Sequence, residues 1–187
     1  MHKNIPLRLI AILVLSAALP LAARAAGFDY TYAEGGYLNA SPSHGSSLSG
    51  AFVDGSYALQ PNWHVGAAFS SASCCSITDN RLAAGFGYNA SIAENLDFIA
   101  DADFLNENVS GGNGSHSGWS IDGGLRARIA PQFELDGLVT HADINSDTEN
   151  TLTIRGLYSL TTNWRLMASF SNNSDENDFM LGVRYAF

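Results

Sequence analysis

The sequence predicts an all-β protein: a closed antiparallel transmembrane β-barrel of about ten strands, with eight strands as the alternative. Three observations predict it. The chain opens with an export signal, apolar and polar residues then alternate along a series of short stretches, and the charged residues of these stretches share one face. A strand that crosses a bilayer needs about 9–11 residues, and its two faces meet lipid and lumen.

The export signal occupies residues 1–25. Basic residues make its start positive, an apolar run with one proline follows, and Ala23-Arg24-Ala25 places small residues before a predicted cut between Ala25 and Ala26. This is the pattern of a secretory signal peptide. The alternative is an N-terminal membrane anchor, for which the apolar run is short. We therefore divide the chain into a cleaved signal, 1–25, and one barrel domain, 26–187.

The charge balance after the signal excludes one class of partner. All 18 acidic residues follow the signal, whereas three of the nine basic residues leave with it, so that arginine but no lysine remains. Nucleic acid is excluded as a partner because its binding needs basic patches. A soluble β-sandwich also alternates, but its polar face and edge strands normally carry lysine. The missing lysine favours the barrel.

Stretches that alternate like strands are separated by clusters of Gly, Asn, Ser and Asp. The predicted strands cover residues 28–38, 49–60, 63–72, 81–90, 95–105, 118–129, 133–142, 151–160, 164–172 and 178–187. Tight turns such as Gln60-Pro61-Asn62 alternate with longer polar stretches at 39–48, 73–80, 106–117, 143–150 and 173–177. Short turns facing the periplasm and longer loops facing outward are typical of outer-membrane barrels.

The charged residues predict which face of each strand points into the lumen and which points to lipid. Successive side chains face opposite ways, and Trp119, Ile121 and Leu125 show how the apolar ones share a face. An arginine facing lipid near the bilayer middle would cost about 2–4 kcal/mol, so we predict that the charges face the lumen. This interior ionic network consists of Asp97, Asp101, Asp103, Asp122, Arg126, Arg128, Glu134, Asp136, Arg155, Arg165 and Arg184. The facing of the first predicted strand stays unresolved, because Asp29 and Glu34 would lie on opposite faces of it.

The interior network has two interpretations. In the first, the ions pair and fill the lumen, since side chains can largely fill a barrel of this size and buried arginine makes bidentate pairs. In the second, the small inward residues of the second to fourth strands, such as Ser56, Gly66 and Gly85, leave a narrow polar path. We take the filled lumen as the expectation and keep the channel as the alternative.

Other candidate chemistry is sparse. The two cysteines, Cys74 and Cys75, are adjacent, so a vicinal disulfide, a contact between two molecules and a lipid-attached thiol all stay open. No Cys and His cluster completes a metal site, and we expect neither a metal nor a cofactor. His141 and Asp143 near the outer rim are the basis for a hydrolase hypothesis. A rim histidine beside a loop aspartate explains them more simply, so we assign no catalytic residue and expect no enzyme.

The last nine residues, Phe179-Met180-Leu181-Gly182-Val183-Arg184-Tyr185-Ala186-Phe187, alternate and end in phenylalanine. They resemble the terminal strand of outer-membrane barrels, and the whole segment after the signal resembles small bacterial barrels of the opacity and virulence-related type. Residues 30–37 and 61–65 resemble a family labelled sulfation-dependent quorum factor, from which we carry over no signalling activity. The resemblance implies a bacterial outer-membrane location and a terminal signal, Gly182, Tyr185 and Phe187, that the barrel-assembly machinery reads.

These observations predict a structural or cell-surface role, with outer loops that meet an extracellular partner. A narrow porin-like channel for ions or small solutes is the alternative, and an outer-rim hydrolase is the second alternative. The barrel would contact outer-membrane lipid and lipopolysaccharide. We expect the acidic residues of the outer stretches to meet lipid A phosphates through bridging divalent cations. These residues are Asp79, Glu107, Asp143, Asp147, Glu149, Asp175 and Glu176.

Overall fold

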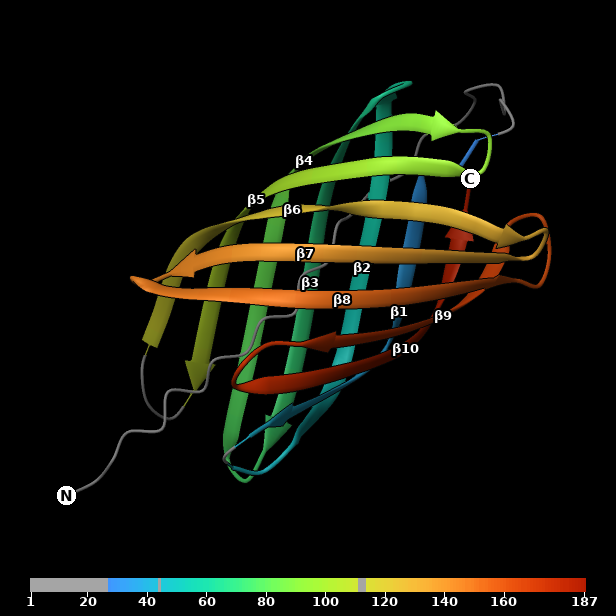
Figure 1. Cartoon of the computed structure of the whole chain (residues 1–187). Coiled ribbons are helices and arrows are strands. Elements are labelled where there is room, and N and C mark those ends of the chain that lie inside the picture. The colour runs from blue at the N-terminus through green and yellow to red at the C-terminus, as the bar shows by residue number, and fades with distance from the viewer. Residues whose placement is uncertain (1–26, 44, 111–113) are drawn as a thin grey trace.

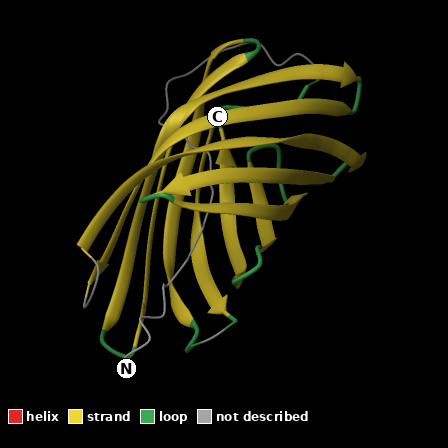
Figure 2. Ribbon diagram, turned by 60° about the vertical axis from the view of Figure 1, so that its left-hand side comes forward, coloured by secondary structure: helices red, strands yellow, loops and turns green. Residues whose placement is uncertain are grey.

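The computed structural model describes residues 27–43, 45–110 and 114–187. Over these residues ten antiparallel strands form one sheet, and β1 closes it by pairing with β10. The strands are β1 (Tyr32–Pro42), β2 (Leu48–Gln60), β3 (Trp63–Cys74), β4 (Ile77–Ala93), β5 (Leu96–Ser110), β6 (Gly114–Ala130), β7 (Phe133–Ile144), β8 (Asp147–Ser159), β9 (Trp164–Asn172) and β10 (Glu176–Ala186). Figures 1 and 2 show the closed wall from two sides. The predicted fold class is confirmed.

The predicted signal, residues 1–25, and its cut between Ala25 and Ala26 lie outside the described residues, so this domain boundary stays a prediction. Within the described ranges, no helix is long and apolar enough to span a membrane. We call the end of the barrel that holds the C-terminus and the connections after β2, β4, β6 and β8 the terminal end. The C-terminus marks it in Figure 1, and the opposite end is the distal end.

The polar stretches predicted as long outer loops are mostly strand. β5 continues to Ser110 and β6 begins at Gly114. The β7–β8 hairpin turns through Asn145 and Ser146, both with positive φ, as type I′ turns require. The prediction of long loops was wrong because side-chain hydrogen bonds across strands let polar residues continue the sheet. Asn106, for example, donates through Nδ2 to the hydroxyls of two serines on β6, at 3.2 and 3.1 Å.

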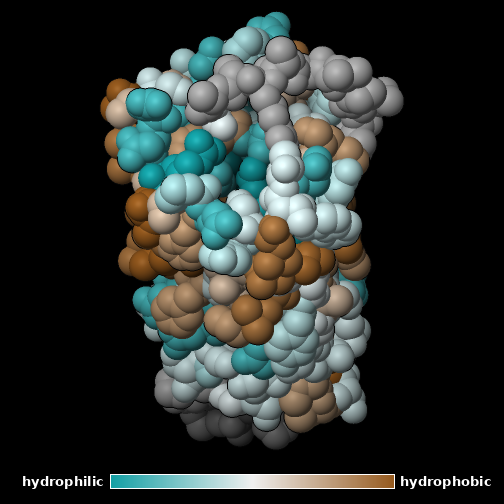
Figure 3. Space-filling view, turned by 90° about the vertical axis from the view of Figure 1, so that its right-hand side faces the viewer, coloured by the Kyte–Doolittle hydropathy of each residue, from teal (hydrophilic) through white to brown (hydrophobic). Residues whose placement is uncertain are grey.

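The outward face of the barrel is apolar over its middle. Phe86, Ile129 and Val139 expose 58, 59 and 57% of their surface. Hydrophobic side chains gather across the middle of the face in Figure 3, with hydrophilic side chains above them. A soluble monomer rarely exposes a continuous apolar band of this kind, whereas a transmembrane barrel requires one.

Aromatic side chains border the apolar band at both ends. Near the terminal end, Trp164 and Tyr185 pack edge to face with ring centroids 4.9 Å apart. Nearer the distal end, Phe69, Phe104 and Trp119 are all exposed on the outward face. Such belts are expected where amphipathic rings meet lipid head groups.

Between the distal aromatic residues and the distal connections, the outward positions of every strand except β7 carry asparagine, serine or threonine. We call this ring the polar collar. Its members are Asn39, Ser41, Ser49, Ser71, Ser73, Thr78, Asn80, Asn106, Asn108, Ser110, Ser115, Ser117, Thr148, Asn150, Asn172 and Asn177. Cross-strand hydrogen bonds order it: Asn39 Nδ2 lies 3.0 Å from Ser49 Oγ, and Asn172 Nδ2 lies 2.8 Å from Asn177 Oδ1.

Candidate functional site

The lumen is the candidate site, because the charged side chains gather there. The structure buries every residue of the predicted interior network except Arg128, whose side chain is 28% exposed at the terminal end. Glu34 and Asp54 join the network on β1 and β2. Since all of these side chains point away from the apolar outward face, lumen and outer surface differ sharply in polarity.

Several ion pairs of the network lie along the barrel wall. Three of them join direct cross-strand neighbours: Arg126 with Asp136 at 2.9 Å, Arg128 with Glu134 at 2.9 Å, and Arg184 with Glu34 at 2.6 Å. Such pairs hold adjacent strands together. Because their partners sit side by side, these three bonds do not cross the lumen.

Residues 27–31, which we call the N-terminal segment, lie across the terminal end of the lumen. Phe28 and Tyr30 are buried there. Tyr30 donates its hydroxyl to Asp97 of β5 at 2.9 Å, and its ring stacks on His64 of β3 at a centroid distance of 5.3 Å. The segment is also tied to β2, because the Ser56 hydroxyl donates to the Tyr30 carbonyl at 2.6 Å.

Arginines from other strands hold the same segment. The Arg126 guanidinium lies 5.0 Å from the centre of the Tyr30 ring, and that of Arg128 lies 4.8 Å from the Phe28 ring. Arg165 of β9 pairs with Asp29. Each cation over an aromatic face contributes about 0.5–2 kcal/mol, more where it is desolvated. Since β3, β5, β6 and β9 all contribute, the segment bridges the lumen.

The unresolved facing of the first predicted strand has its cause here. The wall strand begins at Tyr32 rather than at residue 28, and Glu34 follows its alternation into the lumen. Asp29 precedes the wall strand and lies within the lumen, so the alternation does not apply to it. In the sequence, the only sign that the wall strand begins after Asp29 was that Asp29 and Glu34 would lie on opposite faces of one continuous strand.

Sequence reasoning missed the aromatic residues and His64 as lumen groups. His64 is buried and lies 2.9 Å through Nε2 from Asp101 Oδ1. The small inward residues make room for this pair: a Cβ atom on Gly87 would lie 1.9 Å from Asp101 Oδ1 and 2.2 Å from His64 Nε2. The space opposite the arginines is therefore filled by a histidine and by Tyr30.

A polar cavity of about 20 Å³ adjoins Tyr30 in the lumen. Its lining includes His64, Asp122 and Arg155, and each of them has a buried nitrogen or oxygen atom with no hydrogen-bond partner among the described residues. Burying polar atoms without a hydrogen-bond partner is unfavourable, and the cavity has room for water. We therefore expect water to occupy this part of the lumen.

Toward the distal end the lumen face is apolar and then acidic. Leu38, Phe52 and Met180 belong to one buried cluster. Beyond it, Arg81 pairs with Asp79 at 3.0 Å and with Glu107 at 2.8 Å.

These carboxylates correct one expectation. Asp79, Glu107 and Glu176 are buried inside the barrel, at 3, 9 and 2% exposure, and do not face the lipid side. The interpretation that these three residues meet lipid A phosphates through divalent cations was wrong, because the strands continue past the apolar band and carry them inward. Asp143, Asp147, Glu149 and Asp175 are not buried, and for them the interpretation stays a prediction. Among the described residues, no group of three or more carboxylate, histidine or cysteine side chains is arranged to hold a metal ion.

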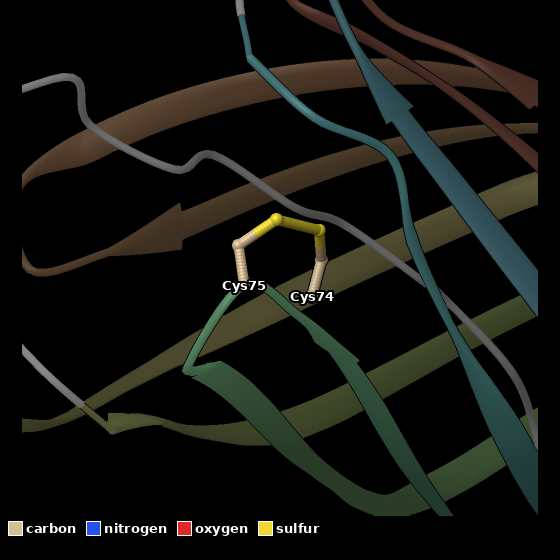
Figure 4. Close-up of a disulfide and its surroundings, with 2 residues drawn as sticks. All are labelled: Cys74 and Cys75. Atoms are coloured by element: carbon tan, nitrogen blue, oxygen red, sulfur yellow. A yellow bond between two sulfur atoms is a disulfide. The ribbon is translucent and has the colours of Figure 1, made fainter.

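The remaining candidates lie apart from the interior ionic network. Cys74 and Cys75 form a vicinal disulfide at the tip of the β3–β4 hairpin (Figure 4). His141 is exposed on the outward face, with its ring 5.6 Å from that of Trp119 and Nδ1 3.0 Å from Asn150 Oδ1. Asp143 shares that face, so the two residues proposed for a hydrolase do not line the lumen.

The terminal signal residues lie where β10 meets β1. Tyr185 packs edge to face against Phe187 at 4.9 Å, and Phe187 donates its backbone N–H to the Thr31 carbonyl at 3.1 Å. Gly182 allows close strand contact, because a Cβ atom there would lie 2.6 Å from the Gly35 carbonyl oxygen. The C-terminal residues therefore complete the seam that closes the barrel.

No protein-family model and no curated protein matches the sequence. Among solved structures, the KdgM porin is similar with a TM-score of 0.50 and 13% identity, over 83% of this chain and 99% of that one. The NanC porin has a TM-score of 0.46 and 13% identity, over 84 and 100%. Neisserial surface protein A has 0.45 and 12%, over 83 and 96%. The chain has the fold of the small bacterial outer-membrane β-barrels.

Proposed function

We propose that this protein is a closed barrel of the bacterial outer membrane with a structural, cell-surface role. The N-terminal segment carries this proposal, because it bridges the terminal end of the lumen with contacts to strands on opposite sides. The apolar outward band supports the membrane location. We assign no catalytic activity, since His141 and Asp143 lie on the outward face.

The proposed role includes two partners. The C-terminal residues Gly182, Tyr185 and Phe187 would present the terminal signal to the barrel-assembly machinery before the seam with β1 closes. The distal hairpins would then be the surface available to an extracellular partner. At this end, most of the described residues between β3 and β8 are strand rather than loop.

Planar-bilayer recording tests the closed lumen. The native chain, refolded in detergent, is expected to give no steady single-channel steps. Phe28→Ala/Tyr30→Ala removes the stacking, the cation–π contacts and the hydrogen bond to Asp97, and is expected to give steps well above the native background. Tyr158→Ala is the matched control, because Tyr158 is an exposed aromatic residue of the outward face. Equal conductance of the native and double-variant chains would overturn the proposal.

A second candidate, a narrow cation-selective channel, is favoured by one observation. Glu176 and Asp178 are buried inside the distal end of the barrel, near the carboxylates that Arg81 pairs with, so carboxylates outnumber Arg81 in this part of the lumen. Steady conductance of the native chain would replace the first candidate with this one. Its reversal potential in a salt gradient should then favour cations, and Glu176→Gln/Asp178→Asn should reduce that preference.

A further inference from the structure

The polar collar is an outward surface without a positive charge. Every arginine among the described residues lies in the lumen or, for Arg128, at the terminal end, and this part of the chain has no lysine. The strand that does not contribute to the collar, β7, carries His141 and Asp143 at the same level. The collar is thus neutral except for one carboxylate and one histidine.

The position of the collar indicates which chemical groups lie beside it. It begins directly beyond Phe69, Phe104 and Trp119, the belt expected at the level of lipid head groups. Recognition of phosphates normally uses arginine or lysine. Amide and hydroxyl side chains instead offer donors and acceptors together, which matches the hydroxyl, ether and amide groups of sugars.

Hydrogen bonds between side chains also order part of the collar. Tyr37 donates its hydroxyl to Ser49 at 2.9 Å, and Asn106 bonds to two serines of β6. Other members, among them Ser73, Asn108 and Thr148, stay exposed. Ordered side chains lose less entropy on binding, which favours a surface of repeated weak hydrogen bonds.

We propose that the polar collar binds the sugar head groups of outer-leaflet glycolipids through neutral hydrogen bonds, without using their phosphates and without a bridging cation. This inference rests on the proposed outer-membrane location. It differs from the divalent-cation bridge that the sequence suggested, in which Asp79, Glu107 and Glu176 cannot take part because they face the lumen.

The test measures the temperature at which the folded full-length barrel loses its compact gel mobility. It uses neutral detergent alone, detergent with intact lipopolysaccharide, with the same lipopolysaccharide after phosphatase treatment, and with phosphatidylglycerol. Both glycolipids are expected to raise this temperature equally, at low and high salt and with a chelator present, whereas phosphatidylglycerol should not. A rise that disappears after dephosphorylation or chelation overturns the proposal, and so does the absence of any rise.

Variants of one cross-strand pair locate the surface. Asn80 and Asn108 are direct neighbours on β4 and β5. Asn80→Ala/Asn108→Ala should weaken the apparent affinity for dephosphorylated lipopolysaccharide about tenfold, as expected for two neutral hydrogen bonds. Asn80→Gln/Asn108→Gln should retain most of it, and Gln60→Ala at the terminal end should leave it unchanged. An unchanged affinity in the alanine pair overturns the proposal.

One further variant shows that the assay detects phosphate binding. Asn80→Lys/Asn108→Lys should add a salt-sensitive rise with intact lipopolysaccharide only, because ammonium groups pair with phosphates. Failure of the collar is distinguishable from failure of the proposed function. A chain that is not a membrane barrel would lack heat-modifiable mobility altogether, whereas a collar without affinity for sugars leaves that mobility in place.

Discussion

Arg184→Met is expected to lower the free energy of unfolding by about 3–5 kcal/mol, because removing one partner leaves a buried charge uncompensated. Arg184 is fully buried, its Nε lies 2.6 Å from Glu34 Oε2, and its guanidinium lies 3.7 Å from the centre of the Tyr32 ring. The Glu34 side chain is also fully buried. Urea unfolding in lipid vesicles, followed by tryptophan fluorescence, measures the change.

Two controls separate burial from charge. Arg128→Met breaks the pair with Glu134, but the Arg128 side chain is 28% exposed, so the expected loss is within about 1 kcal/mol. Glu34→Leu/Arg184→Met removes both buried charges and should recover most of the stability lost in the single variant. A loss in Arg184→Met no larger than that in Arg128→Met would show that the buried pair at the β1–β10 seam is not formed.

Ile154→Arg is expected to lower the free energy of unfolding in vesicles by about 2–4 kcal/mol, because it places a charge on the outward face near the middle of the apolar band. Ile154 is 49% exposed and faces away from the lumen. On a soluble protein the same exposed substitution would change stability by about 0.5 kcal/mol or less. The prediction therefore tests the membrane environment itself.

The matched control for Ile154→Arg places the same substitution at the edge of the apolar band instead of near its middle. Leu160 is 55% exposed and lies beside the turn between β8 and β9, at the terminal edge of the band. Leu160→Arg should lower stability by only about 0–1 kcal/mol, since the penalty falls toward the interface. Equal small effects at both positions, measured by the same urea unfolding, would mean that lipid does not cover the outward face.

Local pattern predicted the wall and its facing. Arg126, Arg155 and Arg184 alternate with apolar neighbours, and this period of two is a property of each strand that needs no knowledge of the others. The distal strand ends were not predictable in this way. Asparagine and serine near Asn106 have the composition of a loop, and only the opposite strand supplies the partners that continue the sheet.

Alternation along the chain is enough to predict the barrel, the order of its strands and the inward position of its arginines, because charge in lipid is unfavourable wherever the strand lies. How the lumen is filled depends on contacts between distant parts of the chain. Tyr30 meets His64 and Asp97 only after the wall has closed, at sequence separations that local alternation does not encode. The inward position of Asp79 and Glu176 also depends on the tertiary structure, because strand pairing extends β4 and β10 far enough to include these residues.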